Sequence, residues 1–282
     1  MTVSDSGTAA EADEREASKD RIIALLGSEW SALTDLLSGL DFDAWSAPAL
    51  PGWDVHDVVA HMVGTETMLD GGPSPEIPDP VGAHVRNDIG RANEAWIVSL
   101  RDRSHAELLA DFRAITAKRL ASLTAMSVDE FWAPSWTPAG QATYGRWLEI
   151  RVFDCWMHEQ DIRAAIGRPG REEGPEAEQS LAEVIGALGY VIGKRGRAPD
   201  GSSVLIGLTG PIKRELRVLT AGRAKVVDSL DEDPTATIAL SSSLFLRLAG
   251  GRQDPEAALD QISLGGDVAL ARQLATNLAF TI

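Results

Sequence analysis

A helix with a polar stripe along an otherwise apolar surface constrains this chain more than any other feature. It runs from about Trp147 to Ile166, contains no proline, and is followed by Gly167 and Pro169, a typical helix stop signal. Most of its surface is apolar, so we expect the helix to be buried. The stripe consists of polar side chains three or four positions apart, and therefore on one face: Arg151, Asp154, His158 and Asp161. Buried ionisable groups must be paired or bound to a metal, because removing an isolated charge from water is costly.

The composition limits the classes of partner. The chain has 282 residues, of which 44% are hydrophobic, so it can bury a sizeable core in one large domain or two ordinary ones. Its 42 acidic residues outnumber its 26 basic residues and give a formal net charge of −16. This charge disfavours nucleic acid and anionic membranes, because both attract Lys and Arg. No stretch approaches the ~18 consecutive apolar residues of a membrane span, so we expect no membrane partner.

The single cysteine and the N-terminal stretch indicate the compartment. Cys155 has no partner for an intramolecular disulfide, which fits a reducing environment. Residues 1–17 are acidic, small and polar, without the basic and apolar regions of a signal peptide, and we expect them to form a disordered leader. The sequence therefore predicts a cytoplasmic protein.

Hydrophobic periodicity predicts a mainly α N-terminal domain over residues 18–170. Two helix starts carry a capping box, in which an N-cap side chain and an acid three residues later satisfy free backbone N–H groups: Asp54 with Asp57, and Ser104 with Glu107. The expected helices cover about residues 17–39, 54–69, 84–100, 104–123 and 147–166, with loops that include 41–52 and 131–140. Long antiparallel helices joined by modest loops form a bundle.

The composition changes after residue 170, and residues 171–282 form the second predicted domain. A connector rich in Gly, Pro and charge precedes a helix over about residues 176–194. Short β-like runs separated by turn residues follow at 203–208, 214–219, 223–227 and 236–240. Helices at 242–249 and 267–278 close the chain. This order of elements predicts an α+β domain with a small antiparallel sheet.

The polar stripe contains a spacing that can hold a metal ion. Asp154 and His158 are four positions apart on one helix, so both side chains can reach one ion. His61, in the middle of the helix at 54–69, can supply a third ligand. Two imidazoles and a carboxylate suit Zn²⁺ or another divalent first-row metal, and three protein ligands leave the open position of a catalytic site. The spacing alone also fits a solvated Asp/His pair and a core histidine with an ordinary partner.

Other residues near the stripe have more than one interpretation. Arg151 and Asp161 can orient His158 or hold a substrate carboxylate, or can simply pair with each other. Cys155 lies among large apolar residues, and we expect a core residue rather than a nucleophile. Glu66, five positions after His61, can support a metal ligand through a hydrogen bond or can be an exposed charge, and we expect it to be exposed. The remaining histidines lie near predicted helix starts and are expected at the surface or near caps: His56, His84 and His105.

Several segments resemble one known family. Residues 51–66 (PGWDVHDVVAHMVGTE), 84–96 and 151–163 resemble the N-terminal domain of the mycothiol-dependent maleylpyruvate isomerase family, one of the DinB-like metal-binding four-helix bundles. Residues 230–238, 244–252 and 262–267 resemble its sterol-carrier-protein-like C-terminal domain. The resemblance covers nearly the whole chain after residue 17.

The resemblance implies a divalent metal, usually zinc, held at the positions of His61, Asp154 and His158. The family motif has Glu where this chain has the shorter Asp154. The implied activity is that of a metal-dependent transferase or isomerase that uses mycothiol, a low-molecular-weight thiol, on a small electrophilic substrate. Such a cofactor supplies the sulfur nucleophile, which fits the lack of a catalytic cysteine. Two alternatives remain open: a zinc hydrolase that uses a metal-bound water, and a non-enzymatic ligand-binding or regulatory protein.

Overall fold

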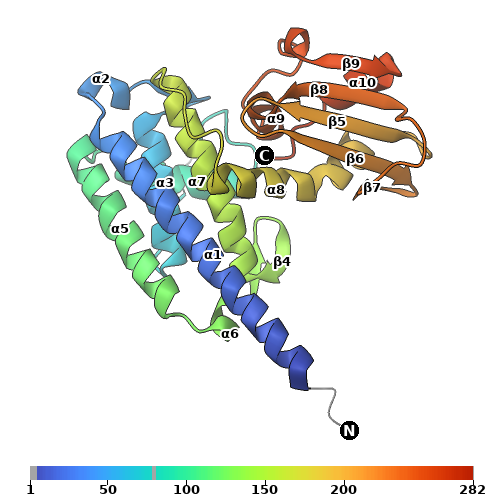
Figure 1. The fold of residues 1–282 in the computed structure, drawn as a ribbon. Helices are drawn as coiled ribbons and strands as arrows, with labels where there is room; N and C mark the ends of the chain where they lie inside the picture. The colour runs from blue at the N-terminus through green and yellow to red at the C-terminus, as the bar shows by residue number, and fades with distance from the viewer. Residues whose placement is uncertain (1–4, 78–80, 282) are drawn as a thin grey trace. The chain divides into compact units, whose positions relative to one another are not determined.

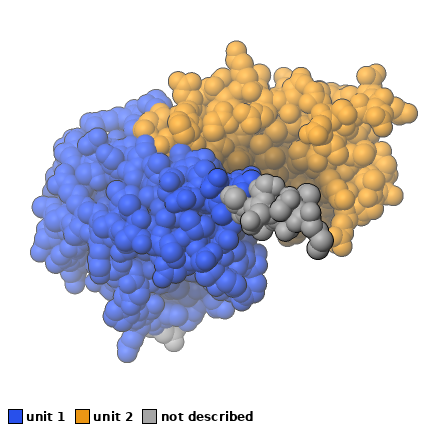
Figure 2. Space-filling model, turned by 60° about the horizontal axis from the view of Figure 1, so that its bottom comes forward, with its two compact units in different colours: residues 1–170 blue, residues 171–282 orange. Residues whose placement is uncertain are grey.

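The computed structural model describes residues 5–77 and 81–281. The chain divides into two compact units, Met1–Gly170 and Arg171–Ile282, which are coloured separately in Figure 2. Among the described residues, no helix combines the length and the apolar surface needed to cross a membrane.

The first unit is a bundle of long helices (Figure 1). Its longer helices are α1 (Asp5–Ser38), α3 (Val55–Leu69), α4 (Asp88–Leu100), α5 (His105–Ala125) and α7 (Tyr144–Ala165). Helices α1 and α3 each pack against both α5 and α7, and α4 packs against α3. Large apolar side chains from α1, α3, α5 and α7 fill the core, among them Leu26, Met62, Phe112 and Val152. The short helices are α2 (Phe42–Trp45) and α6 (Val128–Phe131).

Local hydrogen bonds account for where the key helices begin. The capping boxes predicted at Asp54 with Asp57 and at Ser104 with Glu107 are both present, and they begin α3 and α5. Helix α7 begins after Thr143, whose side chain accepts a hydrogen bond from the backbone N–H of Arg146. These caps fix the register at which α3 and α7 present their polar side chains to the bundle interior.

The structure corrects three local predictions in this unit. Helix α1 begins at Asp5, so the prediction of a disordered leader is wrong for residues 5–17; residues 1–4 lie outside the described part. Alanine and Glu, both strong helix formers, are frequent over these residues and continue the helix. Two predicted loops contain short hairpins, β1 (Pro48–Leu50) with β2 (Trp53–Asp54), and β3 (Pro134–Thr137) with β4 (Gly140–Thr143). Proline in these segments predicts a loop, but edge positions of hairpins tolerate proline. Helix α4 begins at Asp88 rather than near His84, because Asn87 caps it.

The second unit has the predicted α+β architecture. Helix α8 (Pro175–Tyr190) continues as one π-helical turn, Val191–Arg195, and precedes a five-stranded sheet of order β7-β6-β5-β8-β9. The strands are β5 (Ser203–Thr209), β6 (Arg214–Ala221), β7 (Arg223–Val227), β8 (Ala236–Ser241) and β9 (Ser263–Gly266). The remaining helices are α9 (Ser242–Ala249), a 3₁₀ turn (Leu259–Gln261) and α10 (Val268–Ala275).

The sheet departs from the prediction at one strand pair. Strands β5 and β8 are parallel, whereas the other pairs are antiparallel, so the sheet is mixed. Strand β6 is antiparallel to both β5 and β7, so β7 already runs in the direction of β5. The chain then crosses the sheet, and β8 pairs with the other edge of β5 and runs in the same direction as β5. The short, Gly-rich strand β9 was not predicted.

Candidate metal centre

Helices α3 and α7 bring together the three residues predicted to hold a metal. One ligand atom from each of His61, Asp154 and His158 lies within 4.8 Å of the others. His61 Nε2 is 3.5 Å from Asp154 Oδ2, and His158 Nε2 is 3.6 Å from Asp154 Oδ1. Both imidazoles are buried, whereas the Asp154 side chain is 33% exposed. The group therefore has one accessible side.

A carboxylate on the same helix orients His158. Asp161 Oδ2 lies 3.1 Å from His158 Nδ1, and both side chains are buried. With Nδ1 carrying the proton that Asp161 accepts, the lone pair of Nε2 points toward Asp154 and His61. Ligating histidines in metalloproteins usually donate their second ring N–H to a carboxylate or carbonyl in this way. Asp161 is therefore within hydrogen-bond distance of the ring nitrogen through which it would orient His158.

The environment of His61 keeps its ring neutral. Burial lowers the pKa of His61, an effect only partly opposed by Asp154, and a neutral imidazole is the form that binds metals. Its Nδ1 is buried and has no hydrogen-bond partner among the described residues. The indole of Trp53 lies beside both histidines, with ring centroids 5.5 Å from His61 and 6.4 Å from His158, and forms an aromatic wall next to the group.

Arg151 faces protein groups instead of solvent. Its Nε and Nη2 donate to Glu66 Oε1 at 3.0 and 2.8 Å, its Nη1 donates to Asp154 Oδ2, and its Nη2 also lies 3.1 Å from Cys155 Sγ. Burial lowers the pKa of Arg151, but Cys155, Glu66 and Asp154 more than offset this and raise it, so the guanidinium stays charged. With these donors directed to buried protein groups, Arg151 is placed to orient Asp154.

The expectation that Glu66 is exposed is wrong, since the residue is only 1% exposed. Glu66 lies between two arginines from other helices, Arg151 of α7 and Arg119 of α5, whose Nε donates to Glu66 Oε2 at 3.1 Å. The sequence around Glu66 could not reveal these partners, which lie 53 and 85 positions away. Arg119 was missed altogether, and its only signal is a charge on the buried side of α5.

The charges around the group also set the states of Asp154 and Cys155. Burial raises the pKa of Asp154, but the charge of Arg151, followed by interactions with His158 and His61, outweighs burial and holds that pKa well below its usual range. Asp154 is therefore a carboxylate. Burial raises the pKa of the Cys155 thiol, which Arg151 only partly offsets. Cys155 is thus a protonated core residue, as predicted, and not an activated nucleophile.

The donor set fits a divalent metal ion. Tetrahedral zinc with bonds of about 2.1 Å separates its ligand atoms by about 3.4 Å. Each imidazole lies at a similar distance from one oxygen of Asp154, with His61 Nε2 3.5 Å from Oδ2 and His158 Nε2 3.6 Å from Oδ1. A carboxylate and two neutral imidazole nitrogens, one oriented by Asp161, are also the ligand types that such ions take. The residues present therefore match the group implied by the sequence resemblance.

Comparison with known proteins identifies the family. Residues 26–163 match the mycothiol maleylpyruvate isomerase N-terminal domain, and residues 178–273 match the C-terminal domain of the same family. The chain belongs to the mycothiol-dependent maleylpyruvate isomerase family. No curated protein matches this member of the family at the level of sequence.

Two solved structures share the fold of this chain. A crystal structure of the mycothiol-dependent maleylpyruvate isomerase has a TM-score of 0.58 and 18% identity, over 89% of this chain and 94% of that chain. A structure of a histidine-to-alanine mutant of that enzyme gives a TM-score of 0.57 over the same shares of the two chains, also at 18% identity. At this identity the comparison shows a shared fold.

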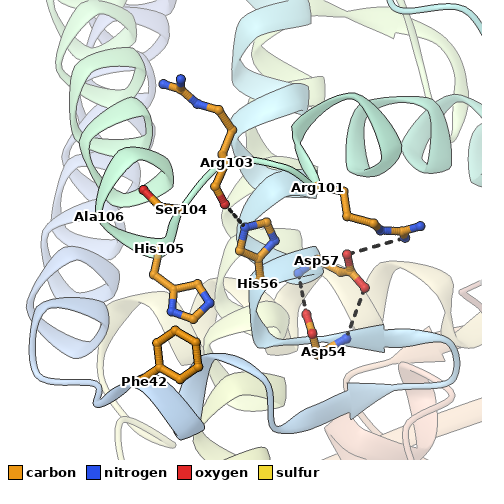
Figure 3. A pocket seen from close by; sticks show the side chains of 9 residues that line it. All are labelled: Phe42, Asp54, His56, Asp57, Arg101, Arg103, Ser104, His105 and Ala106. Carbon is orange, nitrogen blue, oxygen red and sulfur yellow. Dashed lines mark hydrogen bonds and ion pairs between the residues drawn. The ribbon is translucent and has the colours of Figure 1, made fainter.

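A second group of potential ligands lies at the start of α3 in this family member. Asp54, His56 and Asp57 also place one ligand atom each within 4.8 Å of one another, and they line a pocket of about 540 Å³ (Figure 3). Their polar atoms are already engaged. Asp54 Oδ1 accepts from the backbone N–H of Asp57 at 2.9 Å, and His56 Nε2 lies 2.9 Å from the carbonyl of Arg103.

Charge also argues against a cation in this second group. Asp57 Oδ2 accepts from the backbone N–H of Asp54 at 3.4 Å, and Asp57 Oδ1 is 3.7 Å from Nη2 of Arg101. Both carboxylates lie at the N-terminal end of α3, where the helix dipole favours negative charge and opposes a metal ion. We assign Asp54 and Asp57 a helix-capping role. His56 lies in the first turn of α3, near the cap as expected, but is buried and not at the surface. His84 is engaged elsewhere, 3.2 Å from Oε2 of Glu94, and His105 packs against Trp45 with ring centroids 5.0 Å apart.

Proposed function

We propose that this protein is a metal-dependent enzyme that uses mycothiol to transfer or isomerise a small electrophilic substrate. The observation that carries the proposal is the convergence of His61, Asp154 and His158 in the bundle of a chain that belongs to this family. The named activity of the crystallised relative, isomerisation of maleylpyruvate, motivates the reaction class. At 18% identity we propose the class and not that substrate.

In this proposal, His61, Asp154 and His158 hold a divalent metal, most simply Zn²⁺. A divalent metal at this position would lower the pKa of a bound thiol, so that the thiol would be the nucleophilic thiolate at neutral pH. The exposed third of the Asp154 side chain marks the side from which a thiol would enter.

In this proposal, the residues around the three metal ligands have separate roles. Asp161 holds the tautomer of His158, and Arg151 holds Asp154 ionised and in place. Trp53 excludes water from one side of the two imidazoles. The only cysteine, Cys155, is buried and has a raised pKa, so the sulfur nucleophile must come from outside the chain. This requirement favours a thiol-dependent reaction over one that uses a protein thiolate.

The first test measures metal content by mass spectrometry on the purified protein, alone and after incubation with Zn²⁺ followed by desalting. We expect about one metal per chain in the wild type and a loss of this metal in His158→Ala. Circular dichroism of both proteins checks that the substitution leaves the fold intact. A wild type that takes up no metal would overturn the metal-dependent enzyme and favour a ligand-binding or regulatory protein.

The second test separates a thiol enzyme from a hydrolase. The protein is loaded with Co²⁺, whose visible absorption reports its ligands, and titrated with mycothiol. We expect a new sulfur-to-cobalt charge-transfer band that saturates at one thiol per chain. A matched thioether, S-methyl mycothiol, should not produce this band because it has no thiol to ionise. An unchanged spectrum at saturating thiol would exclude the thiol-dependent reaction and favour the hydrolase that activates water.

A further inference from the structure

A chain of buried charges leads away from the candidate metal ligands into the bundle. From Arg151, which contacts Asp154, it passes to Glu66 and then to Arg119. Nη2 of Arg119 donates to the hydroxyl of Tyr144 at 2.6 Å, where the chain ends. It joins α7, α3 and α5, and both arginines are as deeply buried as Glu66. Three buried charged side chains, Arg151, Glu66 and Arg119, therefore form one network with the carboxylate of Asp154.

Stability alone does not explain this arrangement. Burying ion pairs costs desolvation energy that their attraction often only repays, and apolar replacements of similar volume are frequently neutral or stabilising. Such groups are retained in some proteins because they specify one arrangement of side chains. The arrangement specified here is that of Asp154, since Asp154 is where the chain of charges meets the candidate ligands.

The hydrogen bonds show what Glu66 does to Arg151. Both Nε and Nη2 of Arg151 donate to Glu66, which leaves Nη1 to contact Asp154 at its Oδ2 atom. Asp154 Oδ1 receives no hydrogen bond from Arg151 and faces His158 Nε2 at 3.6 Å. Without the charge on Glu66, the guanidinium would be free to turn and pair with both oxygens of Asp154, because arginine binds carboxylates preferentially in a bidentate manner.

We propose that Glu66 is a positioning residue for the metal centre, which acts by restraining Arg151 so that Asp154 keeps one oxygen free for the metal. The proposal rests on the proposed metal-dependent function and deepens it.

The test measures Co²⁺ affinity and the visible spectrum of the Co²⁺ protein for Glu66→Gln, without any assay of activity. Substitutions of residues that orient metal ligands typically weaken metal binding by about 10–100-fold, and we expect a loss in this range together with a shifted cobalt spectrum. The matched control is Asp70→Asn. Asp70 follows Glu66 by one turn and pairs with Lys118 of α5 at 2.5 Å without touching Arg151. This control should bind Co²⁺ as the wild type does.

A double-mutant cycle separates positioning from a direct effect of the Glu66 charge on the ion. If Glu66 acts through Arg151, Glu66→Gln should change the affinity by less than about twofold in an Arg151→Met background, because coupled residues are not additive. An equal loss in both backgrounds would overturn the positioning role. Wild-type affinity and an unchanged spectrum in Glu66→Gln would overturn it as well.

Two further outcomes are decisive. If Glu66→Gln does not fold, Glu66→Asp keeps the charge but withdraws it by one methylene; weakened Co²⁺ binding in a folded protein supports the proposal, and unchanged binding overturns it. If the wild type itself binds no metal, the proposed function fails and this inference falls with it. Metal binding in the wild type together with an unaffected Glu66→Gln variant removes only the role of Glu66.

Discussion

Helix α3 carries two groups of histidine and aspartate that end in different states. At its N-terminus, Asp54, His56 and Asp57 satisfy backbone groups and Arg101. Further along, His61 meets Asp154 and His158 of α7, and the facing atoms of the histidines lie 3.5 and 3.6 Å from the carboxylate, beyond good hydrogen-bond length. The two groups use the same residue types at similar separations.

The difference lies in what the surrounding residues do to each group. The N-terminal group uses its own atoms to cap a helix, so nothing is left for an ion. The inner group is itself held by other residues, with Asp161 on His158 and Arg151 on Asp154. Proximity of potential ligands is therefore a weak indicator of a metal site, and support by neighbouring residues that leaves the ligand atoms free is a stronger one.

The largest effect on metal binding should come from removing a histidine of the inner group, and removing a histidine of the N-terminal group should have none. We expect His61→Ala to abolish stoichiometric metal binding, because it removes one of three ligands, and His56→Ala to leave it unchanged. Both substitutions truncate a buried histidine on α3, so their effects on folding are comparable. Metal content and Zn²⁺ affinity of the two purified variants check this. Equal losses in both would show that the groups do not differ as described.

How far the sequence predicts this comparison depends on the range of the interaction. Local patterns predicted the capping boxes of α3 and α5 and the i, i+4 pair of Asp154 and His158, because their partners are three or four positions apart. His61 was included as a candidate by its place in the middle of a buried helix. At this level, the fold class and the identity of the candidate ligands could be predicted.

The supporting residues could not be predicted, because their partners are distant in sequence. Glu66 is expected to be exposed from its local sequence, but Arg119 and Arg151 of neighbouring helices enclose it in the folded protein. The parallel pairing of β5 with β8 likewise depends on how the chain crosses the sheet, which the alternation within each strand does not contain. Tertiary packing decides both.

A smaller effect should follow from removing one supporting charge. Asp161→Asn keeps the size of the side chain but loses the carboxylate that orients His158, and we expect metal affinity to fall by about tenfold, at the low end of such effects. Titration with a competing chelator measures it. Asp57→Asn is the matched control in the N-terminal group and should leave the affinity unchanged. An unaffected Asp161→Asn variant would mean that packing alone orients His158.

The N-terminal group should instead show its role in stability. Asp54→Ala removes the N-cap of α3, and the loss of such a cap typically lowers the free energy of unfolding by about 1 kcal/mol. We expect this loss in urea denaturation monitored by circular dichroism, with no change in metal affinity. Asp54→Ser retains a capping side chain and should recover most of the stability. A change in metal affinity in Asp54→Ala, with the fold intact, would link the two groups.

The smallest effect is expected in how the free energy of unfolding depends on pH, because Asp57 and Asp154 have opposite pKa shifts. Arg151 holds the pKa of Asp154 low, whereas burial, followed by the charge of Asp54, raises the pKa of Asp57 above its usual range. Folded Asp57 therefore binds a proton more tightly than the unfolded chain does, and its contribution to stability is present below about pH 3.9 and is lost as pH rises through the raised value. We expect the unfolding free energy of the wild type, relative to Asp57→Asn, to decrease as urea denaturation is repeated from pH 4 to pH 7. The opposite slope would show that Arg101 stabilises ionised Asp57 more than burial disfavours it. Asp57 would then resemble Asp154, and the two groups on α3 would differ in their hydrogen bonds but not in how their carboxylates are charged.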